Sequence, residues 1–232
     1  MEMPQVQTCP ICDSSKLRRP FAVHLHNEHG PVEEREPNFP QFSAFSWVIC
    51  RRPSDGKLLL CHEPAAIAGG KPNYWFPAGR VDEGETFRMA GERETLEEAG
   101  VEAVVKGVLL FKIGGGLVPR VVLYAEPVVD APVPKSVPDF ESCGACWLDV
   151  SDLDELTDRD YRGGGTVELY RAVSSGELPP LSLDTPSFAA LEEMVVRLTQ
   201  DESFLMDKWL QEIQQVWALL GKDYPVERLV ME

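Results

Sequence analysis

The sequence predicts an α/β fold, because stretches typical of strands alternate with stretches typical of helices. Aromatic and β-branched residues dominate Phe42–Cys50, and a second apolar run covers Lys57–His62. A strongly charged stretch at residues 79–101 has helical spacing and ends at Gly100, a residue type that closes helices at little steric cost. Further strands are expected at Glu102–Ile113, Val118–Pro127 and Ala145–Val150, the last followed by a short helix at Asp152–Leu156.

The composition indicates a soluble, acidic globular protein. Of its 232 residues, 44% are hydrophobic and 26% are charged, and the formal net charge is −16. Proteins that bind nucleic acid or anionic membranes generally present basic faces, so neither partner is expected. There is no apolar run of about 18 residues, as a membrane span needs, and no basic and apolar signal sequence follows Met1. We therefore expect a cytoplasmic protein, with the nucleus as the alternative.

The charged stretch G-R-V-D-E-G-E-T-F-R-M-A-G-E-R-E-T-L-E-E-A-G-V, residues 79–101, gathers carboxylates at helical spacing. Residues three or four apart share a helix face, so Glu94, Glu97 and Glu98 form one acidic patch. Like charges at that distance repel each other unless a cation lies among them. Magnesium suits such a patch, since it prefers carboxylate oxygens together with substrate phosphates. A solvated acidic helix face is the alternative interpretation.

The same stretch resembles the Nudix box: Gly, five residues, Glu, seven residues, Arg-Glu, an aliphatic residue, any residue, Glu-Glu, any residue, Gly and an aliphatic residue. The matching positions are Gly79, Glu85, Arg93, Glu94, Glu97, Glu98, Gly100 and Val101. Thr95 departs from the pattern, because the family usually has an aliphatic residue there. Arg93 is expected to reach back to Glu85 and tie the loop to the helix. The likeness extends, with less specific residues, from Phe42 to about Ala172.

The resemblance implies a mixed, curved sheet sandwiched by helices. It also implies a pyrophosphohydrolase that uses Mg²⁺ (or Mn²⁺) to cleave a diphosphate linkage in a nucleoside diphosphate derivative. The implied metal ligands are the Gly79 carbonyl and the side chains of Glu94, Glu97 and Glu98. Glu85 would orient Arg93. The base that takes a proton from the attacking water would be Glu97 or Glu98, with Glu141 as the next candidate.

Three interpretations of the function remain open, two of which differ in the substrate. Asp139–Ser142, Trp147 and Leu156–Asp160 more loosely resemble the branch that hydrolyses oxidised guanine nucleoside diphosphates, although a generic strand entry and helix cap explain them equally well. The Pro77–Gly79 entry also resembles ADP-ribose and nucleotide-sugar pyrophosphatases, but Pro119 lies two positions later than their downstream proline. A non-catalytic nucleotide- or protein-binding module is the alternative from another class, and the intact set of box glutamates disfavours it.

The N-terminal segment resembles a Cys₂His₂ zinc finger. Cys9 and Cys12 are followed by His24 and His29 at nearly the required spacing, one residue short in the middle. A segment this small cannot bury enough surface to fold alone, and bound Zn²⁺ would supply the missing free energy. The alternatives are His26 as a ligand, with a poorer spacing, or a segment that binds nothing. Its slight excess of acidic residues favours a structural or protein-binding role over nucleic-acid binding.

Three regions are therefore expected: residues 1–38 as the zinc segment, 39–183 as the hydrolase domain and 184–232 as a helical extension. Asp184–Pro186 is a typical helix start. One apolar stripe consists of Phe188, Leu191, Val195 and Leu198, and a second consists of Leu210, Ile213, Val216, Trp217 and Leu220, with Gly221 expected to end its helix. The stripes either pack on the hydrolase domain or form the contact of a homodimer.

The other cysteines are predicted to be ordinary thiols. Cys143 and Cys146 lie three apart, which on a strand points them to opposite faces. Cys50 and Cys61 have no partner at a recognisable metal-binding spacing. No secretory signal is visible, so disulfides are not expected either.

Overall fold

The computed structural model describes residues 42–63, 74–114, 118–139, 141–154, 165–201 and 206–231. The predicted zinc ligands Cys9, Cys12, His24 and His29 lie outside these ranges, as does the segment Leu156–Asp160. The predicted domain boundaries also remain predictions.

Strands and helices alternate along the described chain, as the sequence predicts. The strands are β1 (Phe45–Cys50), β2 (Leu58–His62), β3 (Tyr74–Trp75), β4 (Ala78–Arg80), β5 (Ala103–Gly114), β6 (Val118–Pro127), β7 (Ala145–Leu148) and β8 (Leu229–Met231). The α-helices are α2 (Phe87–Ala99), α3 (Thr166–Ser175), α4 (Pro186–Thr199) and α5 (Met206–Asp223). Two 3₁₀ helices are η2 (Val150–Asp154) and η3 (Val226–Arg228).

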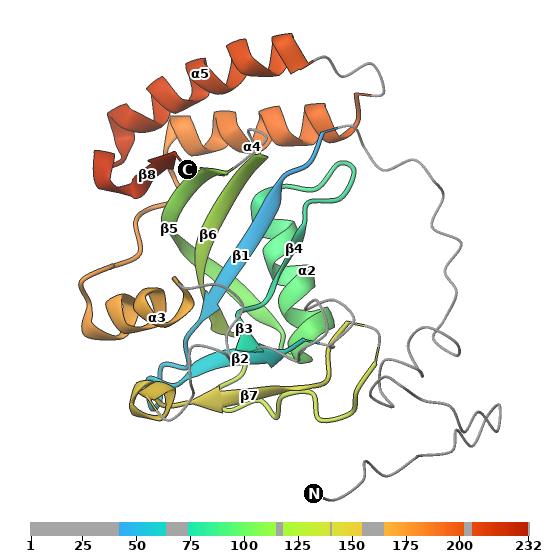
Figure 1. Ribbon diagram of the computed structural model, residues 1–232, viewed down its shortest axis with the longest axis vertical. Coiled ribbons are helices and arrows are strands. Elements are labelled where there is room, and N and C mark those ends of the chain that lie inside the picture. Colours follow the sequence, from blue (N-terminus) through green and yellow to red (C-terminus); the bar gives the residue numbers. More distant parts are fainter. Residues whose placement is uncertain are drawn as a thin grey trace, which may run out of the picture.

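The strands form two sheets (Figure 1). The larger has the order β4-β1-β6-β5-β8, and the smaller has the order β3-β2-β7. Within the larger sheet β1 runs parallel to β6 and β5 parallel to β8, while β1–β4 and β5–β6 are antiparallel. The predicted mixed sheet is thus confirmed, and β4 lies at one of its edges.

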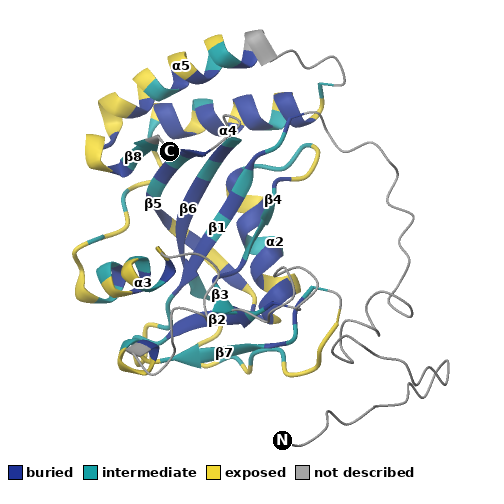
Figure 2. Ribbon diagram, viewed as in Figure 1, coloured by how far each residue is buried: buried dark blue, intermediate teal, exposed yellow. Residues whose placement is uncertain are grey.

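Two apolar cores lie on the two faces of the large sheet. On one face, β1 and β6 residues such as Val48 and Leu123 pack in a core that also contains Phe87 of α2, Phe188 of α4 and Trp209 of α5. The opposite face contributes to a second core, which includes residues of β2, η2 and α3. Figure 2 shows the buried strand positions between these layers. The predicted arrangement of helices on both sides of the sheet is present.

Helix α2 has a start and an end that its sequence specifies. The Thr86 hydroxyl accepts a hydrogen bond from the Met89 N–H, and Gly100 adopts a left-handed conformation with φ = 67°. Thr95, the departure from the Nudix pattern, is fully buried, and its hydroxyl donates to the Gly91 carbonyl at 2.7 Å. Because its polar group is satisfied within the helix, threonine is accommodated there without an unpaired donor.

The C-terminal stripes pack against the large sheet, which is the first of the two interpretations. Phe188, Leu191, Val195 and Leu198 of α4 belong to the main core, together with Trp209, Ile213, Val216 and Leu220 of α5. Trp209, which the sequence analysis omitted, is 1% exposed, whereas Leu210 and Trp217 are only half-buried. The homodimer remains a prediction.

Gly221 does not end α5, and that prediction is wrong. The helix continues to Asp223, and Tyr224 follows with a buried side chain. The Tyr224 hydroxyl donates to the Ser182 carbonyl at 2.7 Å. A glycine inside a helix costs only about 1 kcal/mol relative to alanine, which the buried contacts of the last turn can outweigh.

Smaller differences concern short elements. The strand predicted for Ala145–Val150 ends at Leu148, and the helix predicted for Asp152–Leu156 is the 3₁₀ helix η2 as far as it is described. The sequence analysis did not identify β3, β4, α3 or β8. Among the described residues, no helix combines the length and hydropathy needed to cross a membrane.

We expect Leu191→Ala to lower the free energy of unfolding by about 2–5 kcal/mol, because it opens a cavity in the core between α4 and the sheet. Leu191 is 2% exposed, whereas Leu219 of α5 is 37% exposed. The matched change Leu219→Ala should cost about 1 kcal/mol or less. Urea unfolding of both variants measures the difference. Equal effects would show that α4 contributes little to the core.

Candidate active site

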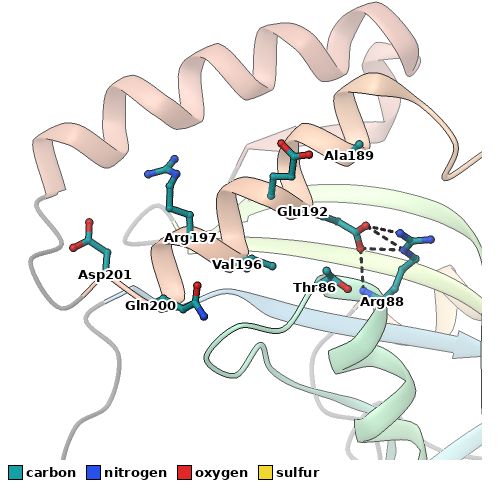
Figure 3. A pocket seen from close by; sticks show the side chains of 9 residues that line it. Thr86, Arg88, Ala189, Glu192, Val196, Arg197, Gln200 and Asp201 are labelled. Carbon is teal, nitrogen blue, oxygen red and sulfur yellow. Dashed lines mark hydrogen bonds and ion pairs between the residues drawn. The ribbon is translucent and has the colours of Figure 1, made fainter.

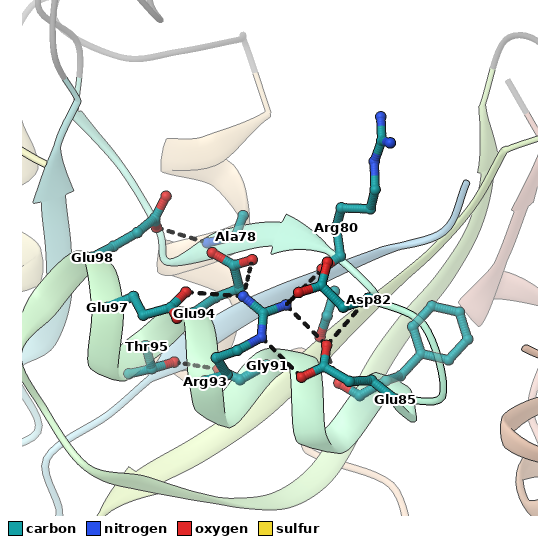
Figure 4. Close-up of polar contacts among 12 residues, drawn as sticks. Ala78, Arg80, Asp82, Glu85, Gly91, Arg93, Glu94, Thr95, Glu97 and Glu98 are labelled. Carbon is teal, nitrogen blue, oxygen red and sulfur yellow. Dashed lines mark hydrogen bonds and ion pairs between the residues drawn. The ribbon is translucent and has the colours of Figure 1, made fainter. Parts of the chain in front are cut away.

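Arg93 joins the two halves of the charged motif (Figure 4). Its guanidinium donates to both oxygens of Glu85, with Nε–Oε1 at 2.8 Å and Nη2–Oε2 at 2.9 Å, and to the Arg80 carbonyl at 2.8 Å. Nη1 also donates to Glu94 Oε1 at 2.8 Å and Glu97 Oε2 at 2.9 Å. Burial raises the pKa of Glu85, but the hydrogen bonds from Arg93 and the Asp82 N–H, together with the charge of Arg93, leave that pKa lowered. The predicted contact between Arg93 and Glu85 is confirmed.

Glu94 lies directly against Gly79 of β4. A Cβ atom added at Gly79 would come within 1.9 Å of Glu94 Oε1, so only glycine leaves room for the carboxylate. Glu94 is 8% exposed. Burial raises its pKa to about 7, helped by the charges of Glu97 and Glu141 and opposed by Arg93. The carboxylate is therefore held in a place where its negative charge is unfavourable without a further cation.

Glu98 is in a similar position, one helical turn further on. It is 8% exposed, and its Oε2 accepts a hydrogen bond from the Ala78 N–H at 2.9 Å. Burial raises its pKa well above the ordinary value, against the effect of that hydrogen bond, and the charges of Glu94, Glu63 and Glu141 raise it further. Four glutamates from three separate parts of the chain thus influence one another here.

The loop before β7 is tied to the end of α2. Lys135 Nζ donates to the Glu97 carbonyl at 2.7 Å, and the Ser142 hydroxyl donates to the Glu98 carbonyl at 2.5 Å. The Lys135 N–H also donates to the Ala99 carbonyl at 2.8 Å. Carbonyls in the last turn of a helix lack intrahelical partners, and a cation there also interacts favourably with the helix dipole.

Asp139 organises this loop from within. Its Oδ1 accepts hydrogen bonds from the Glu141 N–H at 2.9 Å and the Ser142 N–H at 3.1 Å, while Oδ2 pairs with Lys135 Nζ at 2.5 Å. The backbone of Glu141 is consequently fixed relative to the end of α2. This explains how a residue 40 positions beyond the motif comes close to the box glutamates.

The glutamates at this site are the candidate ligands of a divalent cation. In the part of the chain that the structure describes, no group of three or more His, Cys, Asp or Glu side chains is placed to hold a metal ion. Arg93 bonds to Glu94 and Glu97 and so takes up part of their charge. By chemistry, however, the site fits Mg²⁺ or Mn²⁺: it offers carboxylate oxygens and backbone oxygens, and Glu94 and Glu98 are buried like charges.

A family profile described as the NUDIX domain matches residues 42–170, more than half of the chain. The chain belongs to the Nudix family. A protein of Caenorhabditis elegans named as a nudix hydrolase is 31% identical over 124 residues. That alignment covers 52% of this chain and 33% of the relative, so the chain spans about a third of that curated relative's length. The match supports the prediction of a Nudix hydrolase domain.

Solved structures agree on the fold. A NUDIX hydrolase from Nitrosomonas europaea superposes with a TM-score of 0.50 at 19% identity, covering 62% of this chain and 97% of that one. An ADP-ribose pyrophosphatase from Streptococcus suis has a TM-score of 0.42 at 16% identity, covering 59% and 92%. The likeness to the Nitrosomonas europaea structure shows a Nudix fold and no particular substrate.

The structure brings Gly79, Glu85, Arg93, Glu94, Glu97 and Glu98 together where β4 meets α2. It also adds a glutamate that the sequence analysis missed. Glu63 directly follows β2 and is 3% exposed. Its charge acts on Glu98. In the sequence, Glu63 is only a charged residue at the end of an apolar strand. Charged residues are common where a strand passes into a loop, so this position did not indicate a site. Of the other predictions, Cys50, Cys61, Cys143 and Cys146 are free thiols, as expected.

A separate open pocket lies between the start of α2 and helix α4 (Figure 3). Two residues that line this pocket, Arg88 and Glu192, form an ion pair, with Arg88 Nη2 and Glu192 Oε2 at 2.9 Å. The Glu192 side chain is 6% exposed and also accepts from the Arg88 N–H at 3.3 Å. These groups satisfy each other and fasten α4 to α2, so we assign the pocket a structural role and place the chemistry at the glutamate cluster.

We expect Gly79→Ala to lower kcat/KM by about 10- to 100-fold, because the added methyl group must push Glu94 from its place. Gly165→Ala is the matched control, since no heavy atom lies within 4 Å of a Cβ there and its φ is −100°. Steady-state kinetics on both variants, with circular dichroism as a check of folding, measures the effect. Full activity in the folded Gly79→Ala protein would contradict the assigned position of Glu94.

Proposed function

We propose that this Nudix domain hydrolyses a diphosphate linkage in a nucleoside diphosphate derivative. The observation that carries the proposal is the cluster of Glu94, Glu98, Glu63 and Glu141, of which the first three are at least nine-tenths buried. Burying carboxylates so close together is costly. Sites that bind a divalent cation together with substrate phosphates provide the compensating charge. The non-catalytic alternative offers no comparable reason for this arrangement.

Glu94, Glu97 and Glu98, with the Gly79 carbonyl, would hold Mg²⁺ or Mn²⁺. When bound, such an ion neutralises the diphosphate and lowers the pKa of water, which makes hydrolysis at phosphorus possible at neutral pH. Arg93 positions Glu94 and Glu97 through its two Nη1 hydrogen bonds. Glu85 in turn fixes the guanidinium plane from the opposite side. We assign both Arg93 and Glu85 to positioning.

The base that accepts the water's proton is proposed to be Glu98 or Glu97, with Glu141 next. Glu98 is the first choice because its carboxylate lies in the buried glutamate cluster, with Oε2 fixed by the Ala78 N–H. Glu97 is more exposed, with 42% of its side chain accessible, and it is paired with Arg93. Glu141 is held near the cluster by Asp139.

Oxidised guanine nucleoside diphosphates are proposed as the first substrates to examine, with ADP-ribose and nucleotide sugars as the alternative. The proposal rests on the likeness of Asp139–Ser142, Trp147 and Leu156–Asp160 to that branch. Asp139 is already engaged by the loop, and Trp147 Nε1 donates to the Pro132 carbonyl at 3.0 Å. Recognition of the base would therefore fall mainly to Leu156–Asp160, which lies outside the described residues.

Glu98→Gln should leave at most about a tenth of the wild-type rate while preserving the fold, because glutamine keeps the shape and removes a charge that binds the cation. The measurement is phosphate-bond cleavage of a panel of nucleoside diphosphate derivatives with Mg²⁺. Glu83→Gln is the control, since Glu83 lies in the box loop and is exposed. A Glu98→Gln enzyme with near-normal activity would remove Glu98 from the site.

The N-terminal segment is proposed to bind one Zn²⁺ through Cys9, Cys12, His24 and His29. The purified protein should then contain about one equivalent of zinc, and Cys12→Ser should lose it, since the thiolate is a ligand. Elemental analysis measures both. Cys143→Ser is the control, because Cys143 is a half-buried free thiol in the described chain. Zinc-free wild-type protein would end this proposal and leave the hydrolase site untouched.

For the substrate, 8-oxo-deoxyguanosine diphosphate should be cleaved about 10- to 100-fold faster than deoxyguanosine diphosphate. A hydrogen bond from the oxidised base to a charged group contributes roughly 1.5–3 kcal/mol, which corresponds to that preference. The comparison uses kcat/KM for both, beside ADP-ribose. If ADP-ribose is cleaved fastest, the oxidised-guanine branch is the wrong one and the Nudix chemistry stands.

A further inference from the structure

A row of basic and aromatic residues crosses the large sheet, starting one residue after Gly79. Strand register pairs Arg80 of β4 with Phe45 of β1, Phe45 with Arg120 of β6, and Arg120 with Lys112 of β5. Directly paired residues on neighbouring strands place their side chains on the same face of a sheet. Three cations and one aromatic ring therefore lie side by side across four strands.

Trp47 extends this row into a small binding surface. It lies two residues beyond Phe45 on β1 and so shares the same face. Arg120 Cζ is 5.6 Å and Lys112 Nζ is 5.7 Å from the centre of the Trp47 ring, and Arg80 Cζ is 6.0 Å from that of Phe45. We call these residues, Phe45, Trp47, Arg80, Lys112 and Arg120, the cationic row.

Arg120 is held in place by an aromatic contact and by the room beside Gly114. No described residue forms a hydrogen bond or ion pair with its guanidinium, although the side chain is half-buried. A Cβ atom at Gly114 would lie 1.9 Å from Arg120 Nη1, so the absence of a side chain at Gly114 makes room for the guanidinium. Contact with the face of Trp47 uses the charge of arginine but leaves its N–H donors available.

The row stands out against the charge of the whole protein. With a formal charge of −16, the chain has far more acidic than basic residues, yet acidic side chains are absent from these paired positions. Packing alone would be served as well by apolar residues, which cost less to bury. Clustered cations beside aromatic rings suit a ligand that combines phosphate with a flat ring.

The row is connected to the glutamate cluster through Arg80. Its carbonyl accepts the hydrogen bond from Arg93, while its side chain points away from the box carboxylates (Figure 4). β4 is an edge strand, so a ligand can pass around it from one site to the other. Neighbouring strands are about 4.8 Å apart, which places β6 about 10 Å and β5 about 14 Å from β4.

We propose that the cationic row binds a second phosphate group of the substrate, on the ribose of the nucleoside and separate from the diphosphate that is cleaved. This inference rests on the proposed function and concerns one part of its substrate class, the nucleoside diphosphate derivatives with an additional 2′- or 3′-phosphate. Substrates without that phosphate, such as 8-oxo-deoxyguanosine diphosphate or ADP-ribose, would be cleaved without using the cationic row. Arg120 and Lys112 contact that phosphate, and Trp47 contacts the nucleoside.

The test measures binding, so it does not depend on turnover. The ligands are adenosine 2′,5′-bisphosphate and adenosine 3′,5′-bisphosphate, which have no phosphoanhydride bond and therefore cannot be hydrolysed at the glutamate cluster. AMP, which lacks the second phosphate, is the control ligand. Calorimetric titration of the full chain with Mg²⁺ should show one of the bisphosphates binding at least about tenfold tighter than AMP, as expected for a charge-assisted contact. The guanosine series repeats the comparison with another base.

Arg120→Gln and Lys112→Gln should each remove most of this preference and leave AMP binding unchanged. Gly114→Ala should have the same effect as Arg120→Gln, because it displaces the guanidinium without removing its charge. Lys106→Gln is the control for the loss of one positive charge, since Lys106 is exposed elsewhere on β5.

Bisphosphates that bind no tighter than AMP would overturn the inference, as would a preference that Arg120→Gln and Lys112→Gln leave intact. The hydrolysis panel decides the proposed function independently. Cleavage of unphosphorylated derivatives combined with equal binding of AMP and the bisphosphates would therefore refute the cationic row and retain the hydrolase.

Discussion

The guanidinium of Arg93 is the contact on which the geometry of this site depends. It bonds to Glu85 in the loop, to the Arg80 carbonyl in β4, and to Glu94 and Glu97 on its own helix. A planar, permanently charged group with five donors is suited to hold several oxygens in fixed directions. Because the loop, the edge strand and the helix all meet at this one side chain, the box glutamates take defined positions against β4.

The same logic applies at the other end of α2. Lys135 and Ser142 bond to the Glu97 and Glu98 carbonyls, so the last turn of the helix is fastened to the loop that carries Glu141. The side chains of the candidate catalytic glutamates and their backbone are thus held by different partners. This division leaves the carboxylates available for chemistry while the helix end stays fixed, as preorganised sites require.

The C-terminal helices belong to the same packed structure as the site. α4 covers the large sheet next to α2, and the pair formed by Arg88 and Glu192 links the two helices. Strand β8 then adds to the sheet beside β5. Arg228, which is 6% exposed, donates to the carbonyls of Leu109 and Pro179 and so anchors this end of the chain. What the sequence suggested as an extension therefore stabilises the sheet on which the cationic row lies.

The sequence by itself determined what local spacing can encode. Glu94, Glu97 and Glu98 share a face because they are three and four residues apart. Gly100 marks the end of α2, and runs of aromatic, β-branched and other apolar residues mark strands such as β1 and β2. Such features depend on neighbours within one helical turn or one strand, so they can be read in order along the chain.

Only the tertiary structure decided which distant residues meet. Glu63 and Glu141 join the box glutamates through packing of β2 and through the loop held by Asp139. The cationic row exists because strand register, set by pairing between β4, β1, β6 and β5, aligns side chains that lie up to 75 positions apart in sequence. Gly221 stayed helical for the same reason, since burial of Tyr224 outweighed a local preference. No short window of sequence contains the free energies of these long-range contacts.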